Sequence, residues 1–240
     1  WKDVINETLG LRFDSVTSRS LSLLRASEFN RIESRKDYQY RGKFILSENA
    51  VTMFDEFFSM ERDEIAVENK YYSFEDWQQY LKYEILMNVL IARGYGRELV
   101  YYADSIGVLP TKLFDLLCSN SEKYPVFAEL TSAYVATYLE HLFDSEHELE
   151  IYVRAFIREH PNDKEALLTL GHWRVVVSYL VKYVFDDPES KILVELRDAI
   201  EECFSGSEIR QAQVKDELDC LLELAVKLVI NPRERFDSEI

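Results

Sequence analysis

Apolar side chains recur at helical spacing along most of the chain. In the stretch PVFAELTSAYVATYLEHLF, residues 125–143, one stripe carries Phe127, Leu130, Tyr134, Tyr138 and Leu142. Side chains three or four positions apart lie on one face of a helix, so this spacing predicts an amphipathic helix. Patterns of this kind predict about nine helices, including helices near residues 15–32, 47–58, 73–96, 145–158 and 209–230.

One predicted helix is apolar in nearly every direction. It runs through EILMNVLIA, residues 84–92, within the longer stretch from Ser73 to Gly96. Ser73 and Asp76 have the spacing of a capping box at its start, and Gly94 and Gly96 are suited to end it. A helix that is apolar all round must be enclosed by neighbouring helices.

Three sources of cover exist for this helix: its own domain, a second copy of the chain, or a partner protein. About eight other amphipathic helices are predicted, so its own domain is the most economical answer. However, residues 175–184 and 221–230 are almost as apolar and compete for interior positions. We therefore expect the protein to have a large helical interface.

Signals for β-strands are scarce. Residues 38–46 are ambiguous between helix and strand, and the acidic residues 61–72 resemble a loop. The β-branched run at 175–181 could form a strand in isolation, but its helical surroundings favour a helix. The fold class predicted from the pattern is therefore all-α, an irregular helical bundle, with an irregular α-solenoid as the alternative.

The chain has no linker rich in proline, glycine or serine. We therefore expect one helical domain over residues 1–232, followed by a tail at 233–240. Residues 160–173, HPNDKEALLTLGHW, resemble the start of a tetratricopeptide-like helix pair. No 34-residue self-match follows them, so the sequence excludes a regular repeat array.

Composition supports a folded helical protein. Hydrophobic residues make up 47 % of the 240 residues, and seven glycines and five prolines are few for a β-sandwich or barrel. The net charge of −16 argues against binding nucleic acid through this chain's own surface, because that requires clustered Lys and Arg. No charge-free run approaches the roughly 20 residues that span a bilayer, so we expect no membrane partner.

The cysteines and the first residue suggest a compartment and a context. Cys118, Cys203 and Cys220 are widely spaced and adjoin apolar residues, which predicts reduced, buried thiols in the cytosol or nucleus. The sequence starts at Trp1 rather than Met. We therefore expect it to be a segment of a longer protein.

Motifs for catalysis or metal binding are absent from the sequence. In EHLFDSEHE, His141 and Asp144, or Asp144 and Glu148, have helical spacing for a metal, but a helix end near Ser145 would separate His141 from His147. There is no His-Glu-x-x-His or Cys-x-x-Cys motif, and neither a nucleophile elbow nor a glycine loop for phosphate. We therefore predict no catalytic residue, no metal site and no cofactor.

Aromatic residues form the strongest candidate interface. The candidate residues are Phe54, Phe57, Phe58, Trp77, Tyr134 and Tyr138. Ordinary core packing is one interpretation of this density. The functional interpretation is an exposed patch that accepts a partner helix or peptide, because aromatic side chains dominate interface hot spots.

The order of elements resembles the TRFH domain, the helical dimerisation and docking module of telomere repeat-binding factors, especially the fungal ones. The resemblance lies in SLSLLRASEFNRI at 20–32, AVTMFDEFFS at 50–59, the acidic loop, LMNVLIARGYGRELVYYADSI at 86–106 and FAELTSAYVATYLEHLF at 127–143. It covers roughly the first two thirds of the chain. The resemblance implies a nuclear, non-enzymatic scaffold at chromosome ends, whose DNA contact is made by a separate Myb-type domain.

From these patterns we predict a protein–protein interaction scaffold that forms homodimers, docks partner peptides, or does both. Its expected location is the nucleus, at telomeres, with the cytosol as the alternative. Two other functions remain open at this stage: a helical-repeat adaptor of another complex, and an enzyme with a helical-bundle active site.

Overall fold

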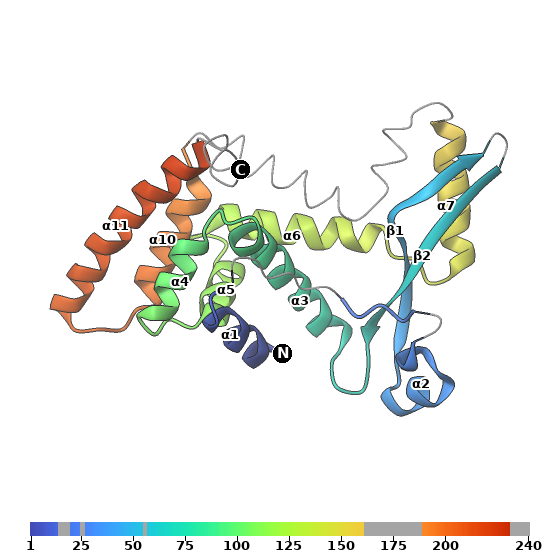
Figure 1. The fold of residues 1–240 in the computed structure, drawn as a ribbon, viewed down its shortest axis with the longest axis horizontal. Coiled ribbons are helices and arrows are strands. Elements are labelled where there is room, and N and C mark those ends of the chain that lie inside the picture. The colour runs from blue at the N-terminus through green and yellow to red at the C-terminus, as the bar shows by residue number, and fades with distance from the viewer. Residues whose placement is uncertain (14–19, 25–26, 55–56, 161–188, 231–240) are drawn as a thin grey trace. The chain divides into compact units, whose positions relative to one another are not determined.

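The computed structural model describes residues 1–13, 20–24, 27–54, 57–160 and 189–230 (Figure 1). Most of these residues are helical, which confirms the predicted irregular helical fold. The described part also contains a two-stranded antiparallel sheet, which the sequence pattern did not predict.

The chain divides into two compact units. The first unit comprises Trp1–Ser18, Lys82–Ser132 and Tyr179–Ile240, and the second comprises Arg19–Leu81 and Ala133–Ser178. Among the described residues, the chain passes between them within the helices α3 (Phe74–Leu86) and α6 (Pro125–Glu140). Each unit is described below by itself.

Several predictions about organisation fall outside the described residues. These include the tail at 233–240, the β-branched run at 175–181, and all but the first residue of the tetratricopeptide-like stretch at 160–173. The single domain over residues 1–232 stays a prediction.

Helices form the first unit. They are α1 (Lys2–Gly10), α4 (Arg97–Ser105), α5 (Pro110–Ser119), α10 (Lys191–Cys203) and α11 (Glu208–Ile230), together with the end of α3 (Phe74–Leu86), η2 (Met87–Ala92) and the start of α6 (Pro125–Glu140). Proline begins both α5 and α6, in the first turn where its missing N–H has no helical partner to lose.

The apolar stretch 84–92 is helical and buried, as predicted. It continues α3 into η2, a π-helical segment whose side chains are almost all inaccessible to solvent. Ser73 and Asp76 form the expected capping box: the Asp76 N–H donates to Ser73 Oγ at 3.2 Å, and the Ser73 N–H donates to Asp76 Oδ2 at 2.9 Å. Gly94, with φ +71°, ends the helical segment in the left-handed conformation.

Neighbouring helices of the same unit cover this stretch. Helix α4 packs on η2, and the side chain of Leu196 on α10 approaches the turn closely at Gly96. A Cβ on Gly96 would lie 2.7 Å from Leu196 of α10 and 2.9 Å from Leu90 of η2, well inside normal contact distance. The chain itself therefore encloses the helix that the sequence singled out.

The second unit is built around a β-hairpin. Its elements are η1 (Glu28–Asn30), α2 (Ile32–Tyr38), β1 (Arg41–Phe54), β2 (Phe57–Glu68) and α7 (Glu146–Glu159), with the start of α3 and the end of α6. Strand β1 pairs antiparallel with β2, with Lys43 opposite Ile65 and a register shift between Leu46 and Val51.

Three predictions about this segment are wrong. Residues 47–54 and 57–58 lie in strands rather than in a helix, residues 61–68 belong to β2 rather than to a loop, and the helical residues in the described part of 15–32 are those of η1 and the first residue of α2. A helix satisfies its backbone hydrogen bonds locally, whereas a strand needs a partner elsewhere in the chain. The periodicity of one segment therefore could not reveal this pairing.

Other segments of the second unit cover both edges of the hairpin. On the β1 edge, Phe44 and Phe143 exchange two backbone hydrogen bonds, of 2.8 and 2.9 Å. On the β2 edge, the Leu23 N–H donates to the Glu64 carbonyl, and the Ala66 N–H donates to the Leu21 carbonyl at 2.9 Å. These contacts satisfy backbone groups that an open edge would leave unpaired.

Helix α7 lies along the hairpin (Figure 1). Leu46 of β1 packs with Leu149 and Val153 of α7 in a buried cluster, with partly buried aromatic side chains around it. Ser145 begins α7, as predicted, because its Oγ accepts a hydrogen bond from the Glu148 N–H.

Candidate functional site: an acidic groove between α10 and α11

Three of the six residues of the predicted aromatic interface are buried. Trp77, Tyr134 and Tyr138 are 4 %, 0 % and 5 % exposed. Within the second unit, the Tyr138 ring contacts both other rings edge-on, with centroids 5.6 Å from Trp77 and 6.0 Å from Tyr134. Their burial favours the core interpretation, and an interface role for these three residues stays a prediction.

The other three predicted interface residues lie at the far end of the hairpin from Arg41. Phe54 and Phe57 are paired in register at the ends of β1 and β2, and Phe58 pairs with Met53. The side chains of the three phenylalanines lie outside the described part of the structure, so their interface role stays a prediction.

A groove in the first unit is the candidate site. Its volume is about 540 Å³, within the range of pockets that hold ligands. It lies over the C-terminal half of α10, the turn after it and the first turns of α11. The lining residues are Lys123, Asp198, Glu201, Glu202, Phe204, Gln211 and Val214.

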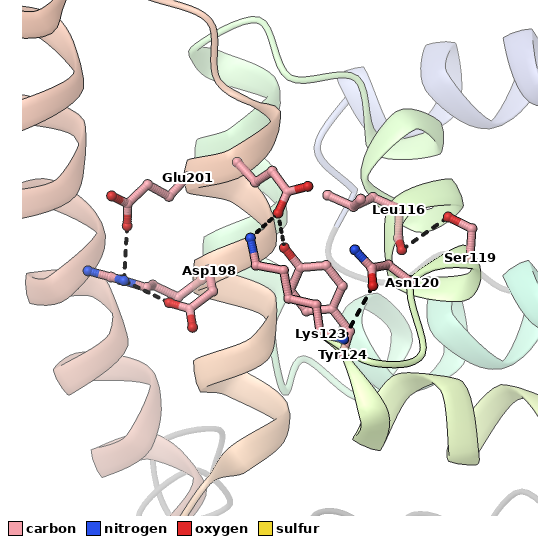
Figure 2. A network of polar contacts seen from close by, with 9 residues as sticks. Leu116, Ser119, Asn120, Lys123, Tyr124, Asp198 and Glu201 are labelled. Atoms are coloured by element: carbon pink, nitrogen blue, oxygen red, sulfur yellow. Dashed lines mark hydrogen bonds and ion pairs between the residues drawn. The ribbon is translucent and has the colours of Figure 1, made fainter.

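The segment before α6 brings Lys123 to this groove. Asn120 holds the segment, accepting a hydrogen bond from the Lys123 N–H on its side chain and one from the Tyr124 N–H on its carbonyl (Figure 2). Glu195 of α10 accepts hydrogen bonds from the first two N–H groups of α6, those of Val126 and Phe127, at 3.0 and 3.2 Å. A carboxylate at a helix N-terminus is stabilised by the helix dipole, so this contact fixes the segment against α10.

Glu202 lies at the Lys123 end of the groove. Lys123 Nζ and the Tyr124 hydroxyl both donate to the same carboxylate oxygen, the hydroxyl at 2.7 Å. These two hydrogen bonds, with Lys123 the larger cause, lower the pKa of Glu202. Burial and then the bond to Glu202 raise the pKa of Tyr124. The carboxylate is therefore held in its charged form.

Arg197 organises the opposite end. Its Nη1 lies 2.7 Å from Asp198 Oδ1 and 3.0 Å from Glu201 Oε2, and its Nη2 donates to Asp219 of α11 at 2.6 Å. The Arg197 side chain is 14 % exposed, whereas those of Asp198 and Glu201 are 44 % and 39 % exposed. Arg197 thus joins α10 to α11 and leaves the two carboxylates partly open to solvent.

The groove also has an apolar part. Val214 of α11 is buried, and Phe204 lies in the turn after α10. The Phe204 ring packs against Gly206. A Cβ at that position would lie 2.4 Å from the ring, so a larger residue would push the ring away. The groove therefore combines apolar surface with a rim of carboxylates.

A smaller hollow of about 100 Å³ lies in the second unit, beside β2 and the start of α7. Three of its charged lining residues are already paired: Arg62 bonds to Glu146, and Glu64 bonds to Arg35. Its small volume and internal pairing make it the weaker candidate for a ligand.

The acidic stretch considered for metal binding has other partners. Lys43 bonds to Asp144 at 2.7 Å and lowers the pKa of that carboxyl, and Glu148 accepts a hydrogen bond from the Asp144 N–H. His141 Nδ1 lies 2.8 Å from the Thr137 carbonyl oxygen of its own helix. Within the described residues, no three side chains of His, Cys, Asp or Glu are placed to share a metal ion.

The prediction for the cysteines is partly wrong. All three are free, but only Cys203 is buried; Cys118 is partly buried and Cys220 is exposed on α11. The neighbouring leucines in the sequence point to other sides of that helix, so adjacency did not predict burial.

The groove itself was missed in the sequence. The signal was present in DAIEEC, where Asp198, Glu201 and Glu202 stand at helical spacing of three and four residues. Carboxylates are so abundant in this chain that such a cluster did not stand out. Only the fold brings Lys123 and α11 beside it.

Comparison with known proteins assigns no family: no protein-family model and no curated protein matches this chain. Across the part of the chain that the structure describes, none of the helices has both the length and the apolar character needed to cross a bilayer.

Proposed function

We propose that this protein is a non-enzymatic scaffold that docks other proteins, with the groove between α10 and α11 as a docking surface. The observation that carries the proposal is an open groove of about 540 Å³ with apolar surface and half-exposed carboxylates. Protein-binding surfaces combine these features, an apolar contact area bordered by polar groups.

The electrostatics of the groove favour binding over acid catalysis. A general acid at neutral pH needs a carboxyl whose pKa is raised toward 7. The pKa of Glu202 is lowered instead, which makes it a poor proton donor and a stable anionic contact.

The resemblance to TRFH domains extends the proposal to a place in the cell. On that basis the protein belongs to a telomere-binding scaffold in the nucleus, with DNA contacted by a separate domain. The net charge of −16 supports the assignment of DNA binding to another domain, because an acidic surface repels the phosphate backbone. Homodimerisation, the other property of that family, is included in the proposal.

Direct binding to purified partners tests the scaffold. Proteins captured by the immobilised chain from a nuclear extract are purified one by one and titrated against it by calorimetry. We expect at least one to bind saturably, with a dissociation constant in the micromolar range or below. If every purified candidate fails to bind, the scaffold proposal is wrong.

Fluorescence microscopy and light scattering test the telomeric part separately. A tagged protein should form foci that coincide with a telomeric DNA probe, and the purified chain should have the mass of a dimer. Diffuse cytosolic fluorescence would exclude the telomeric assignment, and a monomeric mass would exclude the homodimer. Either result leaves the scaffold proposal standing.

A further inference from the structure

We infer that the groove between α10 and α11 binds a basic peptide segment, placing a Lys or Arg side chain at Asp198 and Glu201 and an adjacent apolar side chain on Phe204. This inference rests on the proposed docking function and names the partner's chemistry.

The charge balance of the groove selects a cation. Among the described residues that line the groove, Asp198, Glu201 and Glu202 are carboxylates and Lys123 is the cation, so the lining carries a formal charge of −2. Arg197, which is outside the lining, is shared between Asp198, Glu201 and Asp219. Because the whole chain also carries −16, its field attracts basic segments and repels acidic ones.

The two carboxylates at the Arg197 end have hydrogen-bonding capacity left. Each accepts one contact from Arg197, and a carboxylate has about four acceptor positions. Both side chains are more than a third exposed, and they stand three residues apart on one face of α10. A Lys or Arg head group can therefore lie between Asp198 and Glu201 without displacing Arg197.

The apolar part of the groove favours a peptide over a simple cation as the ligand. The partly exposed Phe204 lines the same hollow as the carboxylates, so an ion alone would leave its ring uncovered. Basic side chains next to an apolar one satisfy both parts. A divalent metal is disfavoured for another reason: the described residues place no three ligand side chains together here.

Lys123 occupies part of the acidic rim in the free protein. Its ammonium bonds to Glu202, so it competes with a second basic side chain of the partner. Replacing Lys123 by Met keeps the methylene chain and removes the charge. Removal of the competing charge should make basic peptides bind more tightly, an effect that a purely structural role of Lys123 would not produce.

Fluorescence anisotropy with a synthetic peptide tests the inference. The probe is a fluorescein-labelled Gly-Ala-Lys-Phe-Ala-Lys-Ala-Gly peptide, titrated with the full chain. Loss of one charge-assisted contact in Glu201→Gln should weaken binding about tenfold, and Lys123→Met should strengthen it about threefold. Glu223→Gln, which changes an exposed carboxylate of α11 outside the groove, is the matched control and should bind as the wild type does.

Circular dichroism of each variant confirms that it is folded, as expected for changes of exposed side chains. Equal binding by wild type and Glu201→Gln, or weaker binding by Lys123→Met, would overturn the inference. A purified protein partner that binds wild type and Glu201→Gln equally would also overturn it while leaving the scaffold proposal intact. The scaffold proposal can also fail alone. In that case no protein partner binds, but the peptide still binds Glu201→Gln more weakly and Lys123→Met more tightly than wild type. The inference that the groove binds basic peptides would then stand.

Discussion

At the residue scale, the three thiols show how the burial of a cysteine on its helix sets its reactivity. Burial, the largest cause, raises the pKa of Cys118 to about 12 and also raises that of Cys203. Cys220 is exposed on α11. The thiolate is the reactive form, so reactivity should follow exposure and thiolate fraction.

We expect a maleimide reagent at neutral pH to modify Cys220 at least about tenfold faster than Cys118 or Cys203. Mass spectrometry of peptides from the folded protein measures the three rates. Cys220→Ser, the control, should abolish the fast phase. Modification of Cys118 first would contradict the arrangement described for α5 and α11.

The ion pair of the groove makes a prediction about pH. Lys123 and Tyr124 lower the pKa of Glu202 below its ordinary value of 4.5 in the folded state. A lowered folded pKa means that the pair contributes stability above pH 4.5 and loses it as the pH falls through the folded pKa. We therefore expect Glu202→Gln to unfold at a lower temperature than wild type at pH 7.

The difference in unfolding temperature between wild type and Glu202→Gln should narrow as the pH falls below 4.5, because wild-type Glu202 then becomes neutral as well. Thermal denaturation followed by circular dichroism at a series of pH values measures it. A difference that stays constant down to acid pH would show that Glu202 contributes through packing rather than charge.

At the scale of the element, the hairpin depends on α7. Leu149 is 1 % exposed and packs on Leu46 of β1, whereas Ile151, on the same helix, is 54 % exposed. Removing a buried leucine side chain loses its transfer free energy and leaves a cavity. Helix α7 therefore offers a matched pair of variants.

Leu149→Ala should lower the free energy of unfolding by about 2–5 kcal/mol, and Ile151→Ala should lower it by less than about 1 kcal/mol. Urea denaturation measures both values. Equal losses in the two variants would contradict the packing of α7 on the hairpin.

At the scale of the whole molecule, the net charge of −16 acts on every encounter with a basic partner. Salt screens such attraction, because the Debye length falls from about 10 Å at 0.1 M to about 3 Å at 1 M. Raising NaCl from about 0.05 to about 0.5 M should weaken binding of the basic peptide by at least about tenfold. Anisotropy titrations measure this change.

The slope of that salt dependence should be shallower for Glu201→Gln than for wild type, since the variant has lost one charge of the groove. Binding that is insensitive to salt would assign the affinity to Phe204 rather than to the carboxylates.

Local signals determined much of the helical fold. The capping box at Ser73 and the glycine at 94 act within one helical turn, and the structure confirms both. The prolines at 110 and 125 likewise stand in the first turns of α5 and α6. The all-apolar stretch at 84–92 required enclosure, and the fold encloses it. Such features depend on neighbouring residues, which a single sequence displays.

Only the tertiary structure decided the hairpin at 41–68, the burial of Trp77 and the position of the groove. Strand pairing joins residues such as Arg41 and Glu68, and the groove joins Lys123 to Glu202 across 79 positions of sequence. No local pattern records which distant segments will meet. Helix starts, helix ends and apolar faces were therefore determined by the sequence itself, whereas strand partners and the shape of the site depended on how those elements packed.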